Sequence, residues 1–340
     1  MAESITDRCR WFTWQRQRLG RAAASLDEAL RDVVLVYSSH PSAPLSLFAR
    51  TRDFTPEAFR ELDRERALRL PGRSVFLMPK DTAHLVFHAV PEPDSRRAYV
   101  LKYFGLTQAQ YEERERKVLA AARKAPVTAK ELRKVTGVER ESQLVSLMCR
   151  DGVLRRIGSE GLRSNQLRYA PARIRKADPD EALAWLAGEY LRAYGPARLE
   201  DFAWWTGAPP ARARAALGKV DTVELEGGLL LRASDAEAFE AAEPPPAGTI
   251  DVLPKWDSLT MGYEAKGRSR LVDDRHLDRA YDFRGDGMPL ILLDGRAIGA
   301  WTARAKGRRM EVEHDWFRKP ARKVLAAVNE RLAEIEELLS

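Results

Sequence analysis

The chain has 340 residues, and its 57 Lys and Arg against 50 Asp and Glu give a net charge of +7. With 44% hydrophobic and 31% charged residues, it is typical of a globular protein, and its length suits two or three ordinary domains or several small ones. The positive charge favours a polyanionic partner, and nucleic acid is a commoner candidate than an acidic membrane surface.

Two cysteines, Cys9 and Cys149, lie too far apart in the sequence for a CxxC pair. This spacing argues for a reducing compartment and against a zinc site. The N-terminus lacks the apolar segment of a signal peptide, and no stretch is long enough for a transmembrane helix. We therefore expect a cytoplasmic protein with no membrane partner.

Residues 1–110 carry the least regular pattern. The spacing of Leu26 and Leu30 predicts one helix, and TPEAFRELDRERAL at 55–68 predicts a second, capped one. Between them, VVLVYSSHPSAPLSLFAR at 33–50 places the polar residues from Tyr37 to His40 between two apolar runs, which predicts a tight loop. SVFLMPKDTAHLVFHAV at 74–90 is expected to form paired strands.

Residues 111–178 predict three helices followed by a hairpin, which is the pattern of a winged helix-turn-helix unit. The first helix is expected at 112–125. Thr128 and Glu131 form a capping box for the second helix, which stops at Gly137, and ERESQLVSLMCRDG provides the third. The runs VLRRIG and QLRYAP, joined by SEGLRSN, are the expected strands.

The same pattern repeats in residues 179–243. The segment ARLEDFAWWTG at 197–207 follows VTAKELRKVTG at 127–137 by 70 residues, with apolar Leu132 and Phe202 at matching positions. The run TVELEGGLLLRAS is expected to form a hairpin that turns at its Gly-Gly pair. We interpret 111–178 and 179–243 as tandem winged helices and 1–110 as a first, degenerate copy.

Beyond a proline-rich linker at 243–248 the composition changes. Runs such as IDVLPKWDSLTMGY and PLILLDGRAIGAW predict β-structure with a turn at Asp294-Gly295, and 321–339 predicts a closing helix. The expected fold class is α+β, with tandem winged helix-turn-helix units followed by a C-terminal β-rich domain at 249–340 that includes the terminal helix.

Four stretches resemble the winged-helix DNA glycosylases of the AlkZ-like type: SSHPSAPLSLFAR, LMPKDTAHLV, EYLRAYGPARLEDFAWWTG, and VLPKWDSLTMGY with the following LDGRAIGAW. The resemblance covers nearly the whole chain. It implies hydrolysis of the N-glycosidic bond of a damaged base in duplex DNA, with no metal and no organic cofactor. We accordingly expect a monofunctional, monomeric, nucleoid-associated hydrolase of base excision repair whose partner is double-stranded DNA.

In that family the catalytic loop reads Gln-x-Gln or Gln-x-Asp, and these side chains position the water that attacks the sugar. The matching positions here hold Tyr37, Ser38 and Ser39, followed by His40 and Pro41. A Ser hydroxyl can orient water, and a His of ordinary pKa, about 6.5, can act as a base near neutral pH. We expect Ser39 or His40 to position the water and Tyr37 to pack against the sugar or base. The alternative is a structural turn in which Ser39 and His40 cap the next helix.

Four further residues are candidates for a supporting role. Asp53 and Asp257 could bring to the loop the carboxylate that it lacks. Trp256 lies where the family borders its DNA cleft, although a structural Trp beside an Asp that holds an Arg is the alternative explanation. His84 is either a satisfied interior or groove-facing residue or a direct participant in the chemistry.

Basic residues are dense on and after the expected hairpin of 111–178 and beside its third helix. Such a run is often a solvated face, but wings of winged helices contact phosphates, and we expect these residues to bind the DNA backbone. They are Arg155, Arg156, Arg163, Arg168, Arg173 and Arg175, together with Arg140 and Lys134.

A second function stays open because the Gln pair is absent: a non-catalytic DNA-binding protein that acts as a damage sensor or a regulator. Two unlike units and a β-domain in one chain do not suggest the symmetric dimer of a regulator. The sequence contains no GxSxG elbow, no P-loop and no GxGxxG after a strand, so it does not support a serine-hydrolase triad or a nucleotide-binding fold.

Overall fold

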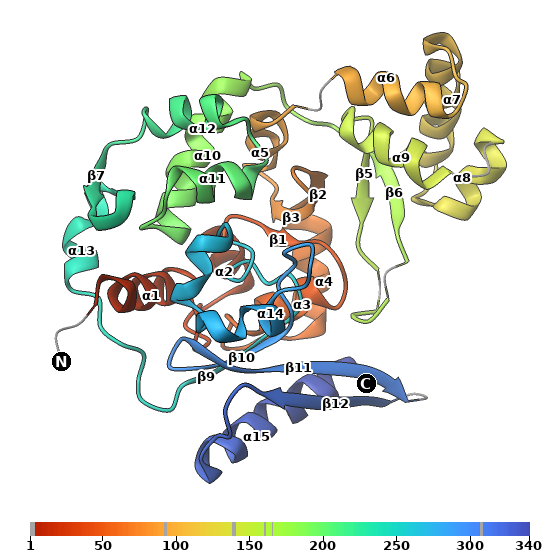
Figure 1. Cartoon of the computed structure of the whole chain (residues 1–340). Helices are drawn as coiled ribbons and strands as arrows, with labels where there is room; N and C mark the ends of the chain where they lie inside the picture. Colours follow the sequence, from red (N-terminus) through yellow and green to blue (C-terminus); the bar gives the residue numbers. More distant parts are fainter. Residues whose placement is uncertain (1–3, 92–93, 138–140, 160, 165, 307–308) are drawn as a thin grey trace.

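The N-terminal segment lies at the centre of the molecule, with the other units arranged around it (Figure 1). The computed structural model describes residues 4–340 except 92–93, 138–140, 160, 165 and 307–308. The central elements are α1 (Ile5–Arg16), α2 (Leu26–Asp32), β1 (Val36–Tyr37), α3 (Ser42–Phe48), α4 (Pro56–Glu61), β2 (Ala67–Pro71), β3 (Val75–Pro79) and α5 (Ala83–Ala89).

Two segments of this central part differ from the prediction. The helix expected at 55–68 ends at Glu61, and a π-helical turn at Leu62–Arg66 leads into β2. Residues 74–90 form strand β3 and then helix α5, not two strands. Ala83, Val86 and Ala89 are buried at the three-residue spacing of a helix, because α5 packs against α10 (Pro179–Tyr194).

The second unit has the three helices and the hairpin that the sequence predicts, and one further helix precedes them. It contains α6 (Asp94–Tyr103), α7 (Gln108–Ala122), β4 (Val127–Thr128), α8 (Ala129–Thr136), α9 (Glu141–Arg150), β5 (Leu154–Ile157) and β6 (Arg168–Pro171). The capping box of Thr128 and Glu131 is confirmed, and Gly137 ends α8 in the left-handed conformation with φ 69°.

The third unit repeats this arrangement. It contains α10, α11 (Leu199–Thr206), α12 (Pro210–Leu217), β7 (Thr222–Leu225), β8 (Leu229–Arg232) and α13 (Ala236–Glu240). Gly207 ends α11 with φ 75°, as Gly137 ends α8. Leu132 and Phe202 are both fully buried, so the two helices use the same inner position 70 residues apart.

The C-terminal part is a four-stranded antiparallel sheet in the order β12-β11-β10-β9, with the last helix packed on it (Figure 1). The expected turn at Asp294-Gly295 is confirmed, with φ of 51° and 77°. Residues 254–263, expected as β-structure, form turns instead. The elements are β9 (Ile250–Leu253), α14 (Leu277–Ala280), β10 (Leu290–Leu293), β11 (Arg296–Lys306), β12 (Arg309–Trp316) and α15 (Arg322–Leu339).

One sheet joins the N-terminal part to the second unit. Its strand order is β1-β3-β2-β5-β6-β4, and the junction is the pairing of Arg69 on β2 with Arg156 on β5. The two segments predicted as separate units, 1–110 and 111–178, are therefore connected through their backbones. Among the described helices, none is long and apolar enough to cross a membrane.

Candidate active site and nucleic-acid interface

The loop from Tyr37 to His40 leaves the edge strand β1 and enters α3. Tyr37 pairs with Phe76 of β3, and the Ser38 N–H group donates to the Val75 carbonyl at 3.0 Å. The His40–Pro41 peptide is cis. Pro41 occupies the N-cap position of α3, where no side chain caps the helix. Ser39 and His40 therefore do not perform the capping role that the sequence left open.

Arg69 is a buried arginine that fixes this loop from strand β2, which β3 separates from β1. Its side chain is only 2% exposed. It donates to the backbone oxygen of Ser38, to Nε2 of His40 at 2.9 Å, and to both carboxylate oxygens of Asp63 at 2.8 and 3.0 Å. A guanidinium group with three fixed partners makes the loop a rigid element, because each donor points in a set direction.

His40 is engaged on both of its ring nitrogens. Nδ1 lies 3.2 Å from the carbonyl oxygen of Leu162, on the loop between β5 and β6, and Nε2 faces Arg69. Burial lowers the pKa of His40 to about 4, and the positive charge of Arg69 adds to this effect. His40 is therefore neutral near pH 7, with Nδ1 as donor and Nε2 as acceptor, and the base role considered for it does not fit this geometry.

Because Ser38 is buried, the more accessible of the three hydroxyl groups on the loop are those of Tyr37 and Ser39. Both residues are half-buried, and neither hydroxyl forms a hydrogen bond with any residue that the structure describes. The Tyr37 ring packs edge-on against Phe76 with 4.7 Å between centroids. Burial raises the pKa of Tyr37 to about 12, so the phenol keeps its proton and can donate it in a hydrogen bond.

Asp257 is a structural residue. It is fully buried and binds both terminal nitrogens of Arg50 at 2.8 Å, while the Ser46 hydroxyl donates to it at 2.7 Å. This ion pair attaches α3 to the segment that carries Trp256, which is half-buried with φ 58°. The structure thus matches the alternative explanation for Trp256 and Asp257, in which the Asp side chain holds an arginine. Asp53 is exposed and follows α3 at its far end from the loop.

Two charged residues that the sequence did not single out, Arg73 and Asp286, lie close enough to Tyr37 for their charges to act on its pKa. The Arg73 guanidinium lies 3.8 Å from the Trp204 ring and donates to the Trp204 carbonyl at 2.8 Å. Arg268 lies 5.3 Å from the same ring and 4.0 Å from Tyr281. The carboxylate of Asp286 contributes to the raised pKa of Tyr37 after burial, and Arg73 opposes it. Trp204 lies in the family-like stretch EYLRAYGPARLEDFAWWTG, whereas no sequence motif marks Arg73, Arg268, Tyr281 and Asp286, which come from three separate segments.

The Asp286 carboxylate forms no hydrogen bond or ion pair with a residue in the described part of the chain, although the residue is half-buried. It therefore differs from Asp257, whose two oxygens are fully occupied. Asp286 is the carboxylate that could act on a charge developing beside Tyr37.

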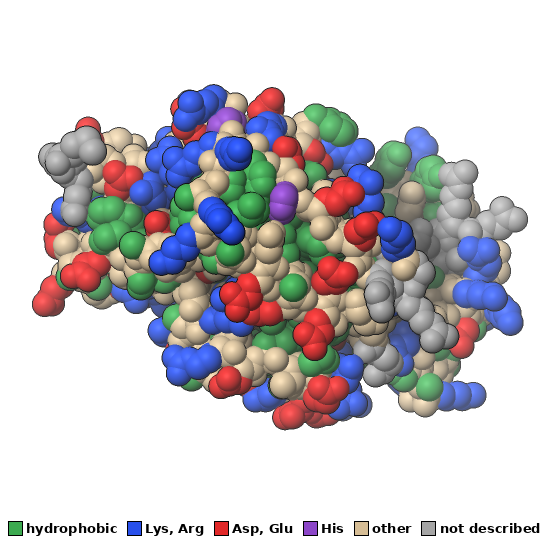
Figure 2. All heavy atoms as spheres, turned by 90° about the horizontal axis from the view of Figure 1, so that it is seen from below, with side chains coloured by type: hydrophobic (Ala, Val, Ile, Leu, Met, Phe, Trp, Pro, Cys, Tyr) green, Lys and Arg blue, Asp and Glu red, His purple; other side chains and the backbone are tan. Residues whose placement is uncertain are grey.

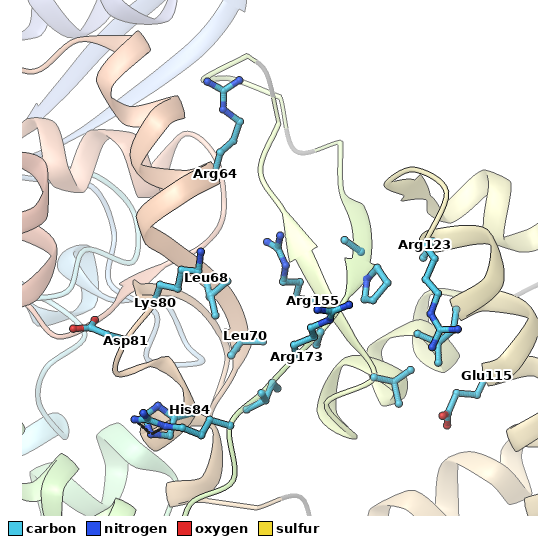
Figure 3. Close-up of a pocket in the computed structure, with 18 residues that line it drawn as sticks. Arg64, Leu68, Leu70, Lys80, Asp81, His84, Glu115, Arg123, Arg155 and Arg173 are labelled. Carbon is cyan, nitrogen blue, oxygen red and sulfur yellow. Dashed lines mark hydrogen bonds between the residues drawn. The ribbon is translucent and has the colours of Figure 1, made fainter.

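A basic cavity of about 820 Å³ lies between the central part and the second unit (Figure 3). Leu68 and Leu70 line it, whereas Arg69 between them faces the loop, so the cavity and the loop lie on opposite faces of β2. Its charged lining consists of Arg64, Lys80, Asp81, His84, Glu115, Arg123, Arg155, Arg173 and Arg175.

Three of the predicted phosphate-binding residues, Arg155, Arg173 and Arg175, meet in this cavity. His84 is an acceptor there: its Nε2 atom lies 3.0 Å from Nε and 2.6 Å from Nη2 of Arg175. Burial lowers the pKa of His84, and Arg175 adds to the shift. His84 thus orients Arg175.

The other predicted basic residues are dispersed. Arg168 and Arg155 line a smaller pocket of about 270 Å³ that also contains Asp63. Arg156 points away from the cavity toward Tyr169, Arg163 and Lys134 are exposed, and Arg140 lies outside the described residues.

The face seen from below shows Lys and Arg side chains grouped around a hydrophobic area, with Asp and Glu beside them (Figure 2). The positive charge of the chain is thus not confined to the second unit. No group of three or more His, Cys, Asp or Glu side chains in the described residues could hold a metal ion.

Comparison with known proteins now identifies the family. The family model of the DNA glycosylase AlkZ-like proteins matches residues 30–335. The chain belongs to the DNA glycosylase AlkZ-like family. The solved structure of Streptomyces sahachiroi DNA glycosylase AlkZ is similar with a TM-score of 0.74 at 20% identity, over 98% of this chain and 96% of that one, which shows the AlkZ fold.

An interstrand DNA cross-link repair glycosylase of Streptomyces sahachiroi is 30% identical to this AlkZ-like chain over 131 residues. The aligned part covers 36% of this chain and 35% of that protein, so it spans about a third of the relative. The expected resemblance to AlkZ-like glycosylases and the α+β fold class are thereby confirmed.

Proposed function

We propose that this AlkZ-like protein is a monofunctional DNA glycosylase that hydrolyses the N-glycosidic bond of a modified base in duplex DNA. One observation carries the proposal: a rigid loop presents the hydroxyl groups of Ser39 and Tyr37, neither of which has a hydrogen-bond partner among the described residues. The loop occupies the positions at which the AlkZ-like glycosylases carry their water-binding side chains, according to the sequence resemblance. Two free hydroxyls on a fixed backbone can orient a water molecule without any metal.

Each residue then has a distinct role. Ser39 orients the attacking water, and Tyr37 packs against the sugar or base and donates a hydrogen bond through its phenolic O–H group, keeping its proton. The water oxygen bonds to the anomeric carbon, the C–N bond breaks, and the base departs with the bonding electron pair. Asp286 stabilises the positive charge that builds on the sugar and accepts the proton that the water loses. Arg69 and His40 position the loop and exchange no proton.

The DNA is held by two features. We assign the second and third units as tandem winged helices, with the central part as a degenerate copy, and Lys134 and the arginines of the hairpin region as phosphate contacts. The protein acts as a monomer without a cofactor, in the cytoplasm at the nucleoid. Because one relative is named for interstrand cross-links, a cross-linked or bulky purine is the first lesion class to examine.

The test is base release under single-turnover conditions. Duplexes that carry cross-linked, alkylated or deaminated bases are incubated with the protein, and alkali then cleaves any abasic sites. Strand breaks at one lesion that fall about 10- to 100-fold in the Ser39→Ala variant would support the proposal, since positioning groups contribute rate enhancements of this order. Ser25→Ala is the matched control, because its hydroxyl caps α2 far from the loop.

A second candidate function is a damage sensor that binds DNA without releasing a base. It rests on the presence of Tyr37 and Ser39 where the family has a Gln pair. This function predicts tight, salt-sensitive binding to distorted duplexes and no base release with any lesion. A footprint at one defined sequence would instead indicate a regulator.

A further inference from the structure

Phe283 is an aromatic side chain that the fold leaves in water. It is 92% exposed, more than any other large hydrophobic residue in the described ranges. The other exposed ones, Tyr99, Tyr103 and Val223, lie on α6 and β7, so Phe283 belongs to no hydrophobic patch. An isolated exposed Phe contributes nothing to folding, because it buries no apolar area. Its ring is therefore available for a contact with another molecule.

The turn that carries Phe283 is rigid. The Asp282 carboxylate accepts hydrogen bonds from the N–H groups of Arg284 at 2.9 Å and Asp286 at 3.0 Å. The backbone closes the turn a second time, from Asp282 N–H to the Asp286 oxygen at 3.0 Å and from Gly285 N–H to the Asp282 oxygen at 2.8 Å. Gly285 has φ +82°, which favours glycine. Phe283 is thus presented in a fixed position and loses little entropy on binding.

The turn is attached to the candidate active loop through the segment 254–260. The Trp256 N–H group donates to the Gly287 carbonyl at 3.0 Å, just after the turn. Two residues along, the Ser258 hydroxyl donates to the Leu35 carbonyl at 2.9 Å, at the start of the strand that leads to Tyr37. These bonds fix the distance between Phe283 and the loop, although the two are far apart in the sequence.

Cationic side chains accompany the aromatic ring. The Arg284 guanidinium lies 5.1 Å from the Phe283 ring, and Arg268 donates to the Gly285 carbonyl at 3.0 Å. Lys255 adds a further positive charge that acts on Asp282. A single aromatic ring among cations suits a nucleic acid, whose bases offer stacking faces between phosphates. A protein interface would need a contiguous apolar area, whereas no other exposed large hydrophobic residue of the described ranges lies on the turn that carries Phe283.

We propose that Phe283 inserts into the base stack of duplex DNA, beside the nucleotide that the Tyr37–Ser39 loop contacts. This inference rests on the proposed function, and it describes how the same site opens the DNA duplex. The ring acts as a wedge that partly unstacks the neighbouring bases and so favours departure of the modified base from the helix, and the nearby cations contact the flanking phosphates.

The experiment uses the full chain and a duplex with a tetrahydrofuran abasic analogue next to 2-aminopurine, whose fluorescence rises when it is unstacked. The variants are Phe283→Ala, Phe283→Leu as the conservative replacement, and Tyr99→Ala as an exposed aromatic control. Because the analogue has no base to release, the assay reports insertion independently of catalysis.

We expect the wild type to raise the fluorescence and to prefer the analogue over an undamaged duplex. Phe283→Ala should lose the fluorescence rise and about 5- to 100-fold in affinity for the analogue, which corresponds to one aromatic–base stack. Its affinity for undamaged duplex should change less than about twofold, while Phe283→Leu retains most of the signal and Tyr99→Ala all of it.

Two results with DNA would overturn the inference: no fluorescence rise with the wild type, or equal signal and affinity in Phe283→Ala. A change in the sedimentation of DNA-free Phe283→Ala would also overturn it, since it would assign the ring to self-association. A protein that inserts Phe283 yet releases no base from any lesion would contradict the proposed glycosylase function and leave the insertion intact.

Discussion

Nη2 of Arg69 lies 2.9 Å from Nε2 of His40, and the same guanidinium group binds both oxygens of Asp63. The shape of the loop thus depends on one buried arginine. Replacing Arg69 with Met would leave the Asp63 carboxylate, 9% exposed, without its partner. We expect Arg69→Met to lower the free energy of unfolding by about 3–5 kcal/mol. Urea denaturation measures this change.

The control for that prediction is Arg60→Met. Arg60 pairs with Glu57, whose side chain is 75% exposed, and exposed pairs are worth about 0–1 kcal/mol. Equal losses in the two variants would contradict the importance of the buried pair.

The lowered pKa of His40, about 4, predicts a pH-dependent stability. Between this value and the ordinary pKa of about 6.5, the unfolded chain binds more protons than the folded one. The contribution of His40 is therefore complete above about pH 6.5 and is lost as the pH falls toward 4, to a total of about 3 kcal/mol. Urea unfolding of His40→Gln across this range should show a weaker pH dependence than the wild type.

His314→Gln, on the exposed face of β12, is the matched control and should follow the wild-type curve. The rate of base release should also show no inflection near pH 6.5, because His40 is already neutral there. A rate that rises with an apparent pKa near 6.5 and loses this dependence in His40→Gln would restore His40 as the base.

Asp257→Asn separates a structural from a catalytic role. The change leaves Arg50 fully buried with a weakened partner, so we expect a loss of about 3–5 kcal/mol in the free energy of unfolding. Base release per folded molecule, measured well below the unfolding temperature, should stay within a factor of about two of the wild type. Loss of release with unchanged stability is the outcome that would place Asp257 in the chemistry.

Asp286→Asn should change the stability little and the rate of base release strongly, which is the opposite of the result expected for Asp257→Asn. Its carboxylate has no intramolecular partner in the described residues, so the free energy of unfolding should change by less than about 0.5 kcal/mol. Removing the charge should slow base release by about 10- to 1000-fold without weakening DNA binding, because the carboxylate acts on a charge present only in the transition state. Asp278→Asn on α14 is a control with the same change of charge. An unchanged rate in Asp286→Asn would remove this assignment.

Arg173→Ala tests whether the basic cavity binds phosphates. Arg173 is exposed at the cavity and forms no ion pair with a described residue. If Arg173 neutralises one phosphate, a plot of the logarithm of the DNA association constant against the logarithm of the salt concentration should become less steep by about 0.9. Arg331→Ala, on α15 and paired with Glu334, is the control and should leave the slope unchanged. Equal slopes in wild type and Arg173→Ala would exclude the cavity from the DNA path.

The sequence by itself determined the features that depend on local chemistry. The capping box of Thr128 and Glu131, the left-handed Gly137 and the repeat at Gly207 are all present as predicted, because these side chains act within one helical turn. The family was also accessible from the sequence, since its stretches are spread over nearly the whole chain.

Only the tertiary structure decided what the candidate site residues do. His40 meets a carbonyl 122 residues away, and Asp257 pairs with an arginine 207 residues away. The same applies to α5. The pattern of its apolar residues is compatible with a strand or a helix, and packing against α10 selects the helix. Local patterns cannot specify such contacts, because burial, partner geometry and the resulting pKa depend on segments that only folding brings together.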